Sequence, residues 1–252
     1  MIMNKSIINR KGLTMAKFPE DVLGVIENYG HDRGMTILYN FCKLFNSSIE
    51  LKSLISDGNM KIPSTTAIFN MSSATNCPSL ALGLCKAQLL DKNGKLKSVC
   101  YAMKSERDYR PNVFPYRERQ KEFWLGVSPE EFVKQFVMIN SSKVIKFDKV
   151  RLNESGDFHN QGCVKKAERI SKLLLDYGIV TYCYTSRSDL DFSRTRRLVI
   201  NASGFKSKGI TNDFLMVPKG KKPPKGYKPC PMDCNRCDRC SIRGSKTWVP
   251  QH

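Results

Sequence analysis

Strand-like and helix-like patterns of apolar residues take turns along the middle of the chain. Residues 65–71 form a short run rich in β-branched and apolar side chains, which predicts the first strand. Similar short runs predict further strands at residues 144–152, 179–185, 198–202 and 214–217. Residues 129–139 and 161–177 instead repeat apolar positions at three- and four-residue spacing, which predicts amphipathic helices. Because helices separate strands, we predict an α/β fold with a parallel sheet, either open or closed into a partial (β/α) barrel.

Residues that favour helix ends support these assignments. Ser128 is the predicted N-cap of the first of the two helices, and Gly178 is the predicted end of the second. The N-terminal part predicts two more helices at residues 19–29 and 35–45, and a short helical stretch is expected from Asp189.

Length and composition fit one main domain with a small appendage. The chain has 252 residues, of which 40% are hydrophobic, so it can bury a substantial core. Residues 219–228 are basic and rich in proline and glycine, which is typical of a linker. We therefore predict an N-terminal helical segment at 1–60, an α/β core with a cysteine-bearing loop at 61–218, and a linker with a cysteine-rich tail at 219–252.

Four cysteines stand close together near the C-terminus, at Cys230, Cys234, Cys237 and Cys240. A disulfide needs a defined separation and orientation of its two Cβ atoms, so this short run cannot pair fully in unstrained bridges. The four thiolates can converge on a metal centre, and both zinc and an iron–sulfur cluster accept four sulfurs. The spacing favours iron and sulfur, because structural zinc usually takes two separated cysteine pairs, but zinc stays the alternative metal.

Three more cysteines, Cys77, Cys85 and Cys100, follow the first predicted strand. Three ligands of this kind would hold three irons of a [4Fe–4S] cluster and leave the fourth iron open. Buried thiols are the alternative, because free cysteine is among the most buried residue types. The serine, asparagine, glycine and proline around Cys77 and Cys85 favour metal ligands instead. Cys42 and Cys183 are predicted to be plain buried thiols.

Polar side chains also follow the later predicted strands. Glu154, Ser155 and Asp157 come after one strand, and Arg187 and Asn201 come after the next two. Functional groups gather at the carboxyl edge of parallel sheets, so we predict that these residues bind a small polar cofactor. Arg187 is suited to a carboxylate or a phosphate. For the first group the alternative is an ordinary turn, in which Asp157 caps the next helix.

The formal net charge of the chain is +19, and lysine and arginine are spread along its whole length. A field of this sign attracts polyanions, so nucleic acid or a nucleotide-linked substrate is the predicted partner. The candidate contacts, which are interleaved with aromatic residues, are Lys104, Arg107, Arg110, Arg117 and Arg119. This mixture suits phosphate contacts with base stacking, and a surface helix with a packed aromatic face explains it equally well.

The first ten residues lack the apolar core of a signal peptide, and no segment approaches the length of a membrane span. In a chain without an export signal, cysteines are typically metal ligands or buried thiols rather than disulfides. We therefore expect a cytoplasmic protein that does not act at a membrane. The sequence leaves its oligomeric state open.

One set of motifs joins the first cysteine group to residues further along the chain. Its members are Cys77, Gly83-x-Cys85, Cys100-Tyr101-Ala102-x-Lys104, Arg110, Asn112 and Arg117. Segments at 150–157 and 184–186 complete the set. Together these motifs resemble the phage gene product 88 family over roughly residues 65–240. The resemblance implies a bacteriophage or prophage source, and therefore a host cytoplasm, but it supplies no activity.

The cysteine loop followed by polar strand ends also resembles radical S-adenosylmethionine (SAM) enzymes. In those enzymes three cysteines after the first strand bind a [4Fe–4S] cluster that takes SAM, and a motif after the second strand holds the SAM amine. The resemblance implies Cys77, Cys85 and Cys100 as cluster ligands, residues 154–157 as the second motif, and an auxiliary cluster at the C-terminal cysteines. The spacing C-x7-C-x14-C departs from the usual C-x3-C-x2-C, and the proline of the second motif is missing.

These observations predict a phage-type iron–sulfur protein with one or two [4Fe–4S] clusters. Its predicted activity is that of a radical-SAM-like enzyme, acting on nucleic acid or a nucleotide-linked substrate. Two alternatives stay open. One is a zinc-stabilised nucleic-acid-binding protein without catalysis, and the other is an iron–sulfur electron carrier or scaffold.

Overall fold

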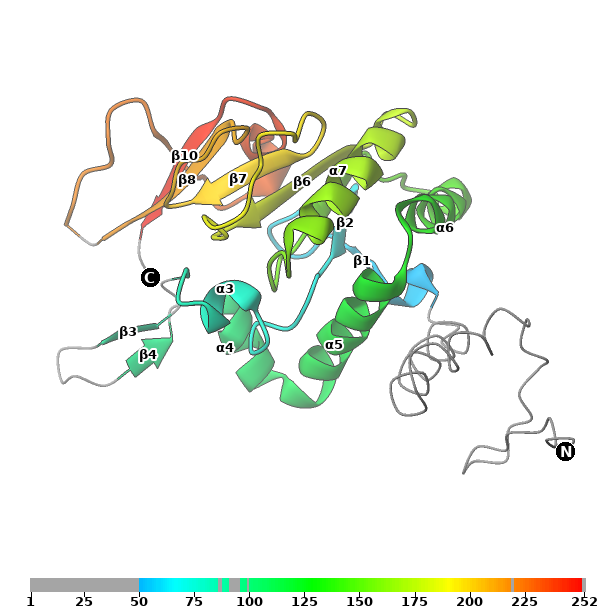
Figure 1. Ribbon diagram of the computed structural model, residues 1–252, viewed down its shortest axis with the longest axis horizontal. Helices are drawn as coiled ribbons and strands as arrows, with labels where there is room; N and C mark the ends of the chain where they lie inside the picture. The colour runs from blue at the N-terminus through cyan, green and yellow to red at the C-terminus, as the bar shows by residue number, and fades with distance from the viewer. Residues whose placement is uncertain (1–49, 86–87, 91–95, 99, 219, 251–252) are drawn as a thin grey trace, which may run out of the picture. The chain divides into compact units, whose positions relative to one another are not determined.

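Eight short strands form the main sheet of the protein (Figure 1). The structure is a computed structural model and describes residues 50–85, 88–90, 96–98, 100–218 and 220–250. The strands of the sheet are β1 (Ser56–Asp57), β2 (Thr66–Phe69), β5 (Lys149–Leu152), β6 (Val180–Thr185), β7 (Val199–Ser203), β8 (Asn212–Val217), β9 (Lys228–Pro229) and β10 (Lys246–Pro250). Their order is β1-β2-β5-β6-β7-β8-β10-β9, and every pair is parallel except β1 with β2.

Helices and a small hairpin precede the first strand or occupy the connections between the strands. They are η1 (Leu51–Leu54), α3 (Pro78–Ala81), β3 (Gln88–Leu90), β4 (Leu96–Ser98), α4 (Tyr101–Asp108), α5 (Arg110–Gly126), α6 (Pro129–Ser142), α7 (Gln161–Leu175), η2 (Cys234–Arg236) and η3 (Arg239–Ser241). α7 links β5 to β6 as in a βαβ unit, and it packs beside α6 (Figure 1). Among the described helices, none has the length and apolar character needed to cross a membrane.

The two faces of the sheet differ in chemistry, because alternate side chains of a strand point to opposite sides. In β5, Val150 and Leu152 are fully buried and belong to the hydrophobic core that includes α6 and α7. Lys149 and Arg151 point to the other face, where they line a cavity. The register pairs Arg151 with Tyr182 of β6, so this second face carries a cation beside aromatic rings.

Aromatic side chains pack between the sheet and the helices. Phe69 of β2 meets Phe132 of α6 edge to face, with the ring centroids 5.4 Å apart. Trp124 of α5 packs against the same Phe132 ring at 6.3 Å, and all three side chains are fully buried. Each such pair contributes about 0.5–1.5 kcal/mol beyond the burial of its area. The cluster therefore fixes α5 and α6 against the end of β2, where the loop to Cys77 begins.

The predicted elements of the core are present, with shifts at their ends. Ser128 caps α6 as predicted, because its hydroxyl accepts a hydrogen bond from Glu131 N at 3.1 Å. β5 begins later than predicted, and Val144 at the expected start of the strand is 98% exposed. The helical stretch expected from Asp189 is wrong, since the connection between β6 and β7 consists of turns and bends. Hydrogen-bonding side chains hold that connection without a helix.

The fold class is α/β with a mostly parallel sheet, as predicted. The partial barrel is not confirmed, because β1 and β9 are the two edges of the sheet among the described strands. The sheet also extends past the predicted boundary at residue 219, since β10 pairs with β8 over its whole length. The cysteine-rich tail is therefore built into the sheet. The helices predicted at 19–29 and 35–45 lie outside the described residues, as does Cys42.

Candidate functional site

A cavity of about 960 Å³ lies on the face of the sheet opposite α7. Side chains of β2, β5, β6, β8 and β10 line it, together with residues of the two cysteine-bearing segments. All seven cysteines predicted as metal ligands are among the lining residues: Cys77, Cys85, Cys100, Cys230, Cys234, Cys237 and Cys240. The two groups are far apart in the sequence, so it is the fold that brings them to one place.

Hydrogen bonds and the sheet hold the tail cysteines over this face. Cys234 N donates to Lys61 O at 2.8 Å, which ties the tail to the segment before β2. Asn201 of β7 donates from Nδ2 to Cys240 O at 2.9 Å and to Cys183 O at 3.0 Å. The sequence predicts that Asn201 binds a cofactor, but its amide group anchors the tail instead. It does not line the cavity in the described structure.

Two cysteines of the first group stand at the starts of helices. Cys77 is the N-cap residue of α3, and Cys100 is the N-cap residue of α4. Ser79 of α3 donates to Asp157 Oδ2 at 2.6 Å, which connects the loop after β2 to the loop after β5. Cys77 and Cys85 are close enough to interact electrostatically. These cysteines thus share the cavity, and their convergence on a single point stays a prediction.

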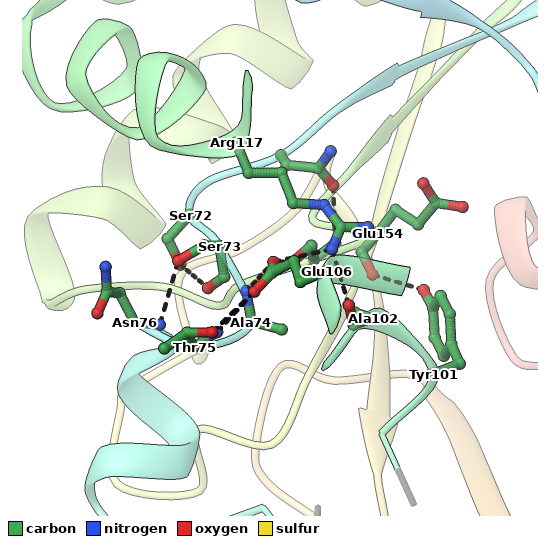
Figure 2. Close-up of polar contacts among 12 residues, drawn as sticks. Ser72, Ser73, Ala74, Thr75, Asn76, Tyr101, Ala102, Glu106, Arg117 and Glu154 are labelled. Atoms are coloured by element: carbon green, nitrogen blue, oxygen red, sulfur yellow. Dashed lines mark hydrogen bonds and ion pairs between the residues drawn. The ribbon is translucent and has the colours of Figure 1, made fainter. Parts of the chain in front are cut away.

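A buried carboxylate holds the loop that leads from β2 to Cys77. Glu106 of α4 accepts hydrogen bonds from Ala74 N at 2.5 Å and from Thr75 N at 3.1 Å. The same carboxylate pairs with Arg117 Nη1 of α5 at 2.8 Å. Figure 2 shows it between the loop and the guanidinium. Glu106 is 4% exposed and Arg117 is 5% exposed, so each charge depends on the other for its stability.

Burial raises the pKa of three cavity thiols, those of Cys77, Cys234 and Cys240, above the ordinary value for cysteine. Removal from water raises the pKa of Cys77 to about 12, and the nearby Asp157 carboxylate acts in the same direction. Burial also raises the pKa of Cys240 to about 11, although a hydrogen bond with Tyr184 acts to lower it. The thiolate is the form that binds a metal, so metal binding must release these protons.

The donor set of the cavity has the chemistry of a metal–sulfur centre. Thiolate sulfur is the ligand that zinc and iron–sulfur centres share. Cys234 interacts electrostatically with Cys230 and Cys237, and Cys240 interacts with Cys230 and Cys234, so the tail thiols are near one another. Within the described ranges, however, no three His, Cys, Asp or Glu side chains are placed to hold one metal ion. The thiols would have to draw together to bind a single ion.

The carboxylate and hydroxyl groups predicted after β5 reach the cavity. Glu154, Ser155 and Asp157 are all among its lining residues. The Asp157 carboxylate is nevertheless engaged within the protein, because it accepts hydrogen bonds from Thr185 Oγ1 at 2.7 Å and from Ser186 N at 2.8 Å. It joins the end of β5 to the end of β6. Ser155 is buried as well, and its hydroxyl donates to Glu106 Oε1 at 3.5 Å, so Glu154 is the most accessible of the three.

Arg187, predicted to clamp a carboxylate or phosphate of a ligand, has a partner in its own loop. Its side chain pairs with Asp189 Oδ2 at 2.7 Å, and its guanidinium also donates to Phe158 O. Arg187 is buried and is not among the described residues that line the cavity. It therefore stabilises the loop after β6 rather than facing the cavity.

The turn after β5 depends on two residues in the left-handed region. Asn153 has a φ of 52°. Its Nδ2 atom donates to Tyr184 O at 2.6 Å, and its Oδ1 atom accepts from Tyr184 N at 3.1 Å. Gly156 has a φ of 76° and lies against Ser72 of the loop after β2. The tight turn predicted at Gly156 is therefore present, and it packs on the loop that leads to Cys77.

The floor of the cavity carries a charged residue that the sequence analysis missed. Arg151 of β5 lies with its guanidinium carbon 4.9 Å from the centroid of the Tyr184 ring. Tyr101 and Tyr182 line the cavity as well. The available signal was the alternation Lys-Val-Arg-Leu in β5, which sets Arg151 on the face opposite the buried Val150.

The residues predicted to contact nucleic acid fall on α4 and α5. Lys104, Arg107 and Arg119 are exposed there, as such contacts require. The prediction for Arg117 is wrong, because its guanidinium is buried and paired with a carboxylate inside the protein. The side chain of Arg110 lies outside the described part of the structure.

Comparison with known proteins identifies a family for most of this chain. A family model described as Gene product 88 matches residues 45–213, which include the first cysteine group and the loops after β5 and β6. The four tail cysteines lie beyond the matched residues. No curated protein and no solved structure matches the chain. The match covers more than half of the 252 residues, so the chain belongs to the gene product 88 family.

Proposed function

We propose that the protein is an iron–sulfur protein whose cavity holds one or two [4Fe–4S] clusters. One observation carries the proposal: the seven cysteines of two distant segments line a single cavity. Cysteines that serve only packing are found elsewhere, since Cys163 and Cys183 are buried in the apolar core. The prediction that Cys183 is a plain buried thiol is therefore confirmed. Thiols gathered around an open space support ligands rather than packing.

The size of the cavity supports a cluster over a single ion. Zinc requires all of its donors within about 2.0–2.3 Å of one point. An iron–sulfur cluster takes its thiolates around a larger inorganic core. The seven cysteines are among the residues that line a space of about 960 Å³, which leaves room for the larger core. Zinc at the four tail cysteines is the alternative that a metal analysis separates.

We also propose that the protein is an enzyme. The cavity has the size of sites that hold small organic ligands, about 300–1,000 Å³, whereas a carrier of electrons needs no such space. Glu154 and Ser155 reach it from the carboxyl edge of a parallel sheet. When bound, a [4Fe–4S] cluster with an open iron supplies single electrons for the cleavage of SAM. In this radical-SAM-like enzyme, Glu154 and Ser155 would orient the ligand while the cavity walls exclude water.

Replacement of one cysteine in each group should lower the iron content per chain. Cys77→Ser removes a thiolate from the first group, and Cys237→Ser removes one from the tail. Each should reduce iron in anaerobically purified protein, measured by elemental analysis together with the absorption spectrum. Cys163→Ser is the matched control, because it removes a buried thiol that does not line the cavity. The control should keep the iron content of the parent protein.

The outcomes of this test separate the candidate functions. If the parent protein holds zinc instead of iron, and Cys237→Ser loses that zinc, the zinc-stabilised alternative is favoured. Iron that is lost in both variants from a protein that binds no SAM would favour an electron carrier or scaffold. A parent protein that holds no metal after anaerobic reconstitution would contradict the proposal.

We also propose that nucleic acid or a nucleotide-linked substrate is the partner of the protein. The net charge of +19 and the exposed basic residues of α4 and α5 support this proposal. Neutralising phosphates releases counterions, so log K should fall linearly with log salt, with a slope of about 0.9 per phosphate contact on duplex DNA.

Charge reversal on α4 and α5 should weaken binding to RNA or DNA and flatten its salt dependence. The variant carries Glu at Lys104, Arg107 and Arg119. Removal of three phosphate contacts should lower the salt slope by up to about three, for all sequences alike. A filter-binding series across salt concentrations measures both effects. The control reverses three exposed charges on α7, at Lys165, Arg169 and Lys172. Equal losses in the two variants would show that α4 and α5 are not the interface.

A further inference from the structure

A cation without an ionic partner lies on the floor of the cavity. Arg151 donates from Nη2 to the Tyr101 hydroxyl at 3.2 Å, and its guanidinium carbon is 4.9 Å from the centroid of the Tyr184 ring. Its Nε atom is buried and has no hydrogen-bond partner among the described residues. One face of the guanidinium therefore rests on an aromatic ring, while part of its donor edge is unused.

The two buried arginines of the described chain show what is missing at the half-buried Arg151. Arg117 pairs with Glu106 at 2.8 Å, and Arg187 pairs with Asp189 at 2.7 Å. No ion pair among the described residues includes Arg151. Arg151 is half-buried in the wall of the cavity and has no carboxylate partner there, so its position indicates a site for an anion.

The acidic residue on the same strand end does not fill this role. Glu154 is near enough to Arg151 to interact electrostatically, but it forms no ion pair with it. The Glu154 carboxylate instead accepts a hydrogen bond from Asn59 Nδ2 at 2.7 Å. The Nε atom is covered by protein, so an anion that enters the cavity would meet the Nη atoms of Arg151, one of which donates to the Tyr101 hydroxyl.

We propose that Arg151 binds the carboxylate or phosphate of a small organic anion inside the cavity. The planar fork of a guanidinium matches the oxygens of both groups. Leu80, Met103 and Met232 also line the cavity and offer apolar surface to the organic part of such a ligand. The inference rests on the proposed function in using the same cavity. It assigns to Arg151 the ligand-clamping role that the sequence had placed at Arg187.

Three ligands that share adenosine test the assignment. AMP carries a phosphate, SAM carries a carboxylate, and adenosine carries neither. Calorimetry on the full-length, anaerobically purified protein should show that AMP or SAM binds at least about tenfold more tightly than adenosine, since hydrogen bonds to charged groups are the stronger ones. The tighter of the two ligands identifies the oxyanion. Arg151→Gln should lose this preference.

Two further variants keep the test decisive. Arg169→Gln removes an exposed arginine from α7 and should leave the preference unchanged. Arg151→Lys keeps the charge without the fork, so it should weaken AMP or SAM binding even if Arg151→Gln does not fold. A parent protein with no preference for either anion, including one that binds none of the three ligands, would overturn the proposal. So would anion preference retained in both Arg151 variants.

Iron content measured on the same samples separates this inference from the proposed function. Loss of anion preference in Arg151→Gln at unchanged iron content supports a ligand site. Loss of iron with the preference retained would show that Arg151 serves the thiolates instead, and would overturn the inference. A parent protein without iron that still prefers AMP to adenosine would defeat the proposed cofactor and leave the anion site supported.

Discussion

Glu106→Gln should lower the free energy of unfolding by about 3–5 kcal/mol, the cost of leaving a buried charge without its partner. Arg117 would stay inside the protein with only the Ala102 carbonyl and a neutral amide as acceptors. Ala74 N and Thr75 N would also lose a charged acceptor. Urea denaturation of the variant and the parent protein measures the difference.

The matched control is Glu130→Gln, which removes an exposed carboxylate paired with Arg169 at 2.9 Å. Exposed ion pairs contribute little to stability, so the control should unfold at the urea concentration of the parent protein. A loss below about 1 kcal/mol in Glu106→Gln would contradict the prediction and place the pair among ordinary surface contacts.

Gly156→Ala should destabilise the protein by about 1–3 kcal/mol more than Gly178→Ala. Both glycines have a positive φ, 76° and 73°, so both variants carry a backbone strain of about 1–2 kcal/mol. A Cβ at Gly156 would also lie 2.2 Å from Ser72 Oγ, 2.6 Å from Ser72 N and 2.8 Å from Ser72 O. The hydroxyl can rotate away, but the backbone atoms move only with their loop, and such overpacking costs about 1–3 kcal/mol.

Gly178 is a close control because a Cβ there meets nothing within 4 Å. The difference between the two variants therefore isolates the contact with Ser72 from the shared backbone strain. Free energies of unfolding from urea titrations give that difference. Equal losses would show that the loop after β2 yields to the added methyl group.

Glu106→Gln and Gly156→Ala both act on the loop that follows β2. Gly156 packs against Ser72 at its start, and Glu106 holds Ala74 and Thr75 further along. This loop carries the chain from β2 to Cys77, so its position determines where the first thiol of the cavity lies. Some polar groups near the cavity therefore hold this loop in place, and they are not available to bind a ligand.

Local patterns in the sequence determined most of the elements. Ser128 caps α6 and Gly156 makes a tight turn, because each depends on neighbours within a few residues. The family followed from short motifs in the same way. The seven candidate cysteine ligands could also be identified from their spacing in the sequence, and in the structure they all line one cavity.

Pairing between distant segments decided the rest. β10 lies beside β8 and so brings the tail cysteines to the cavity of the first group, a parallel pairing that no local pattern specifies. The same holds for buried charge. Arg117 pairs with a buried carboxylate and Arg187 with an exposed one, whereas Arg151 faces the cavity without a carboxylate partner. Whether an arginine is buried, and with which partner, depends on contacts across the fold, and the periodicity of its own segment does not encode them.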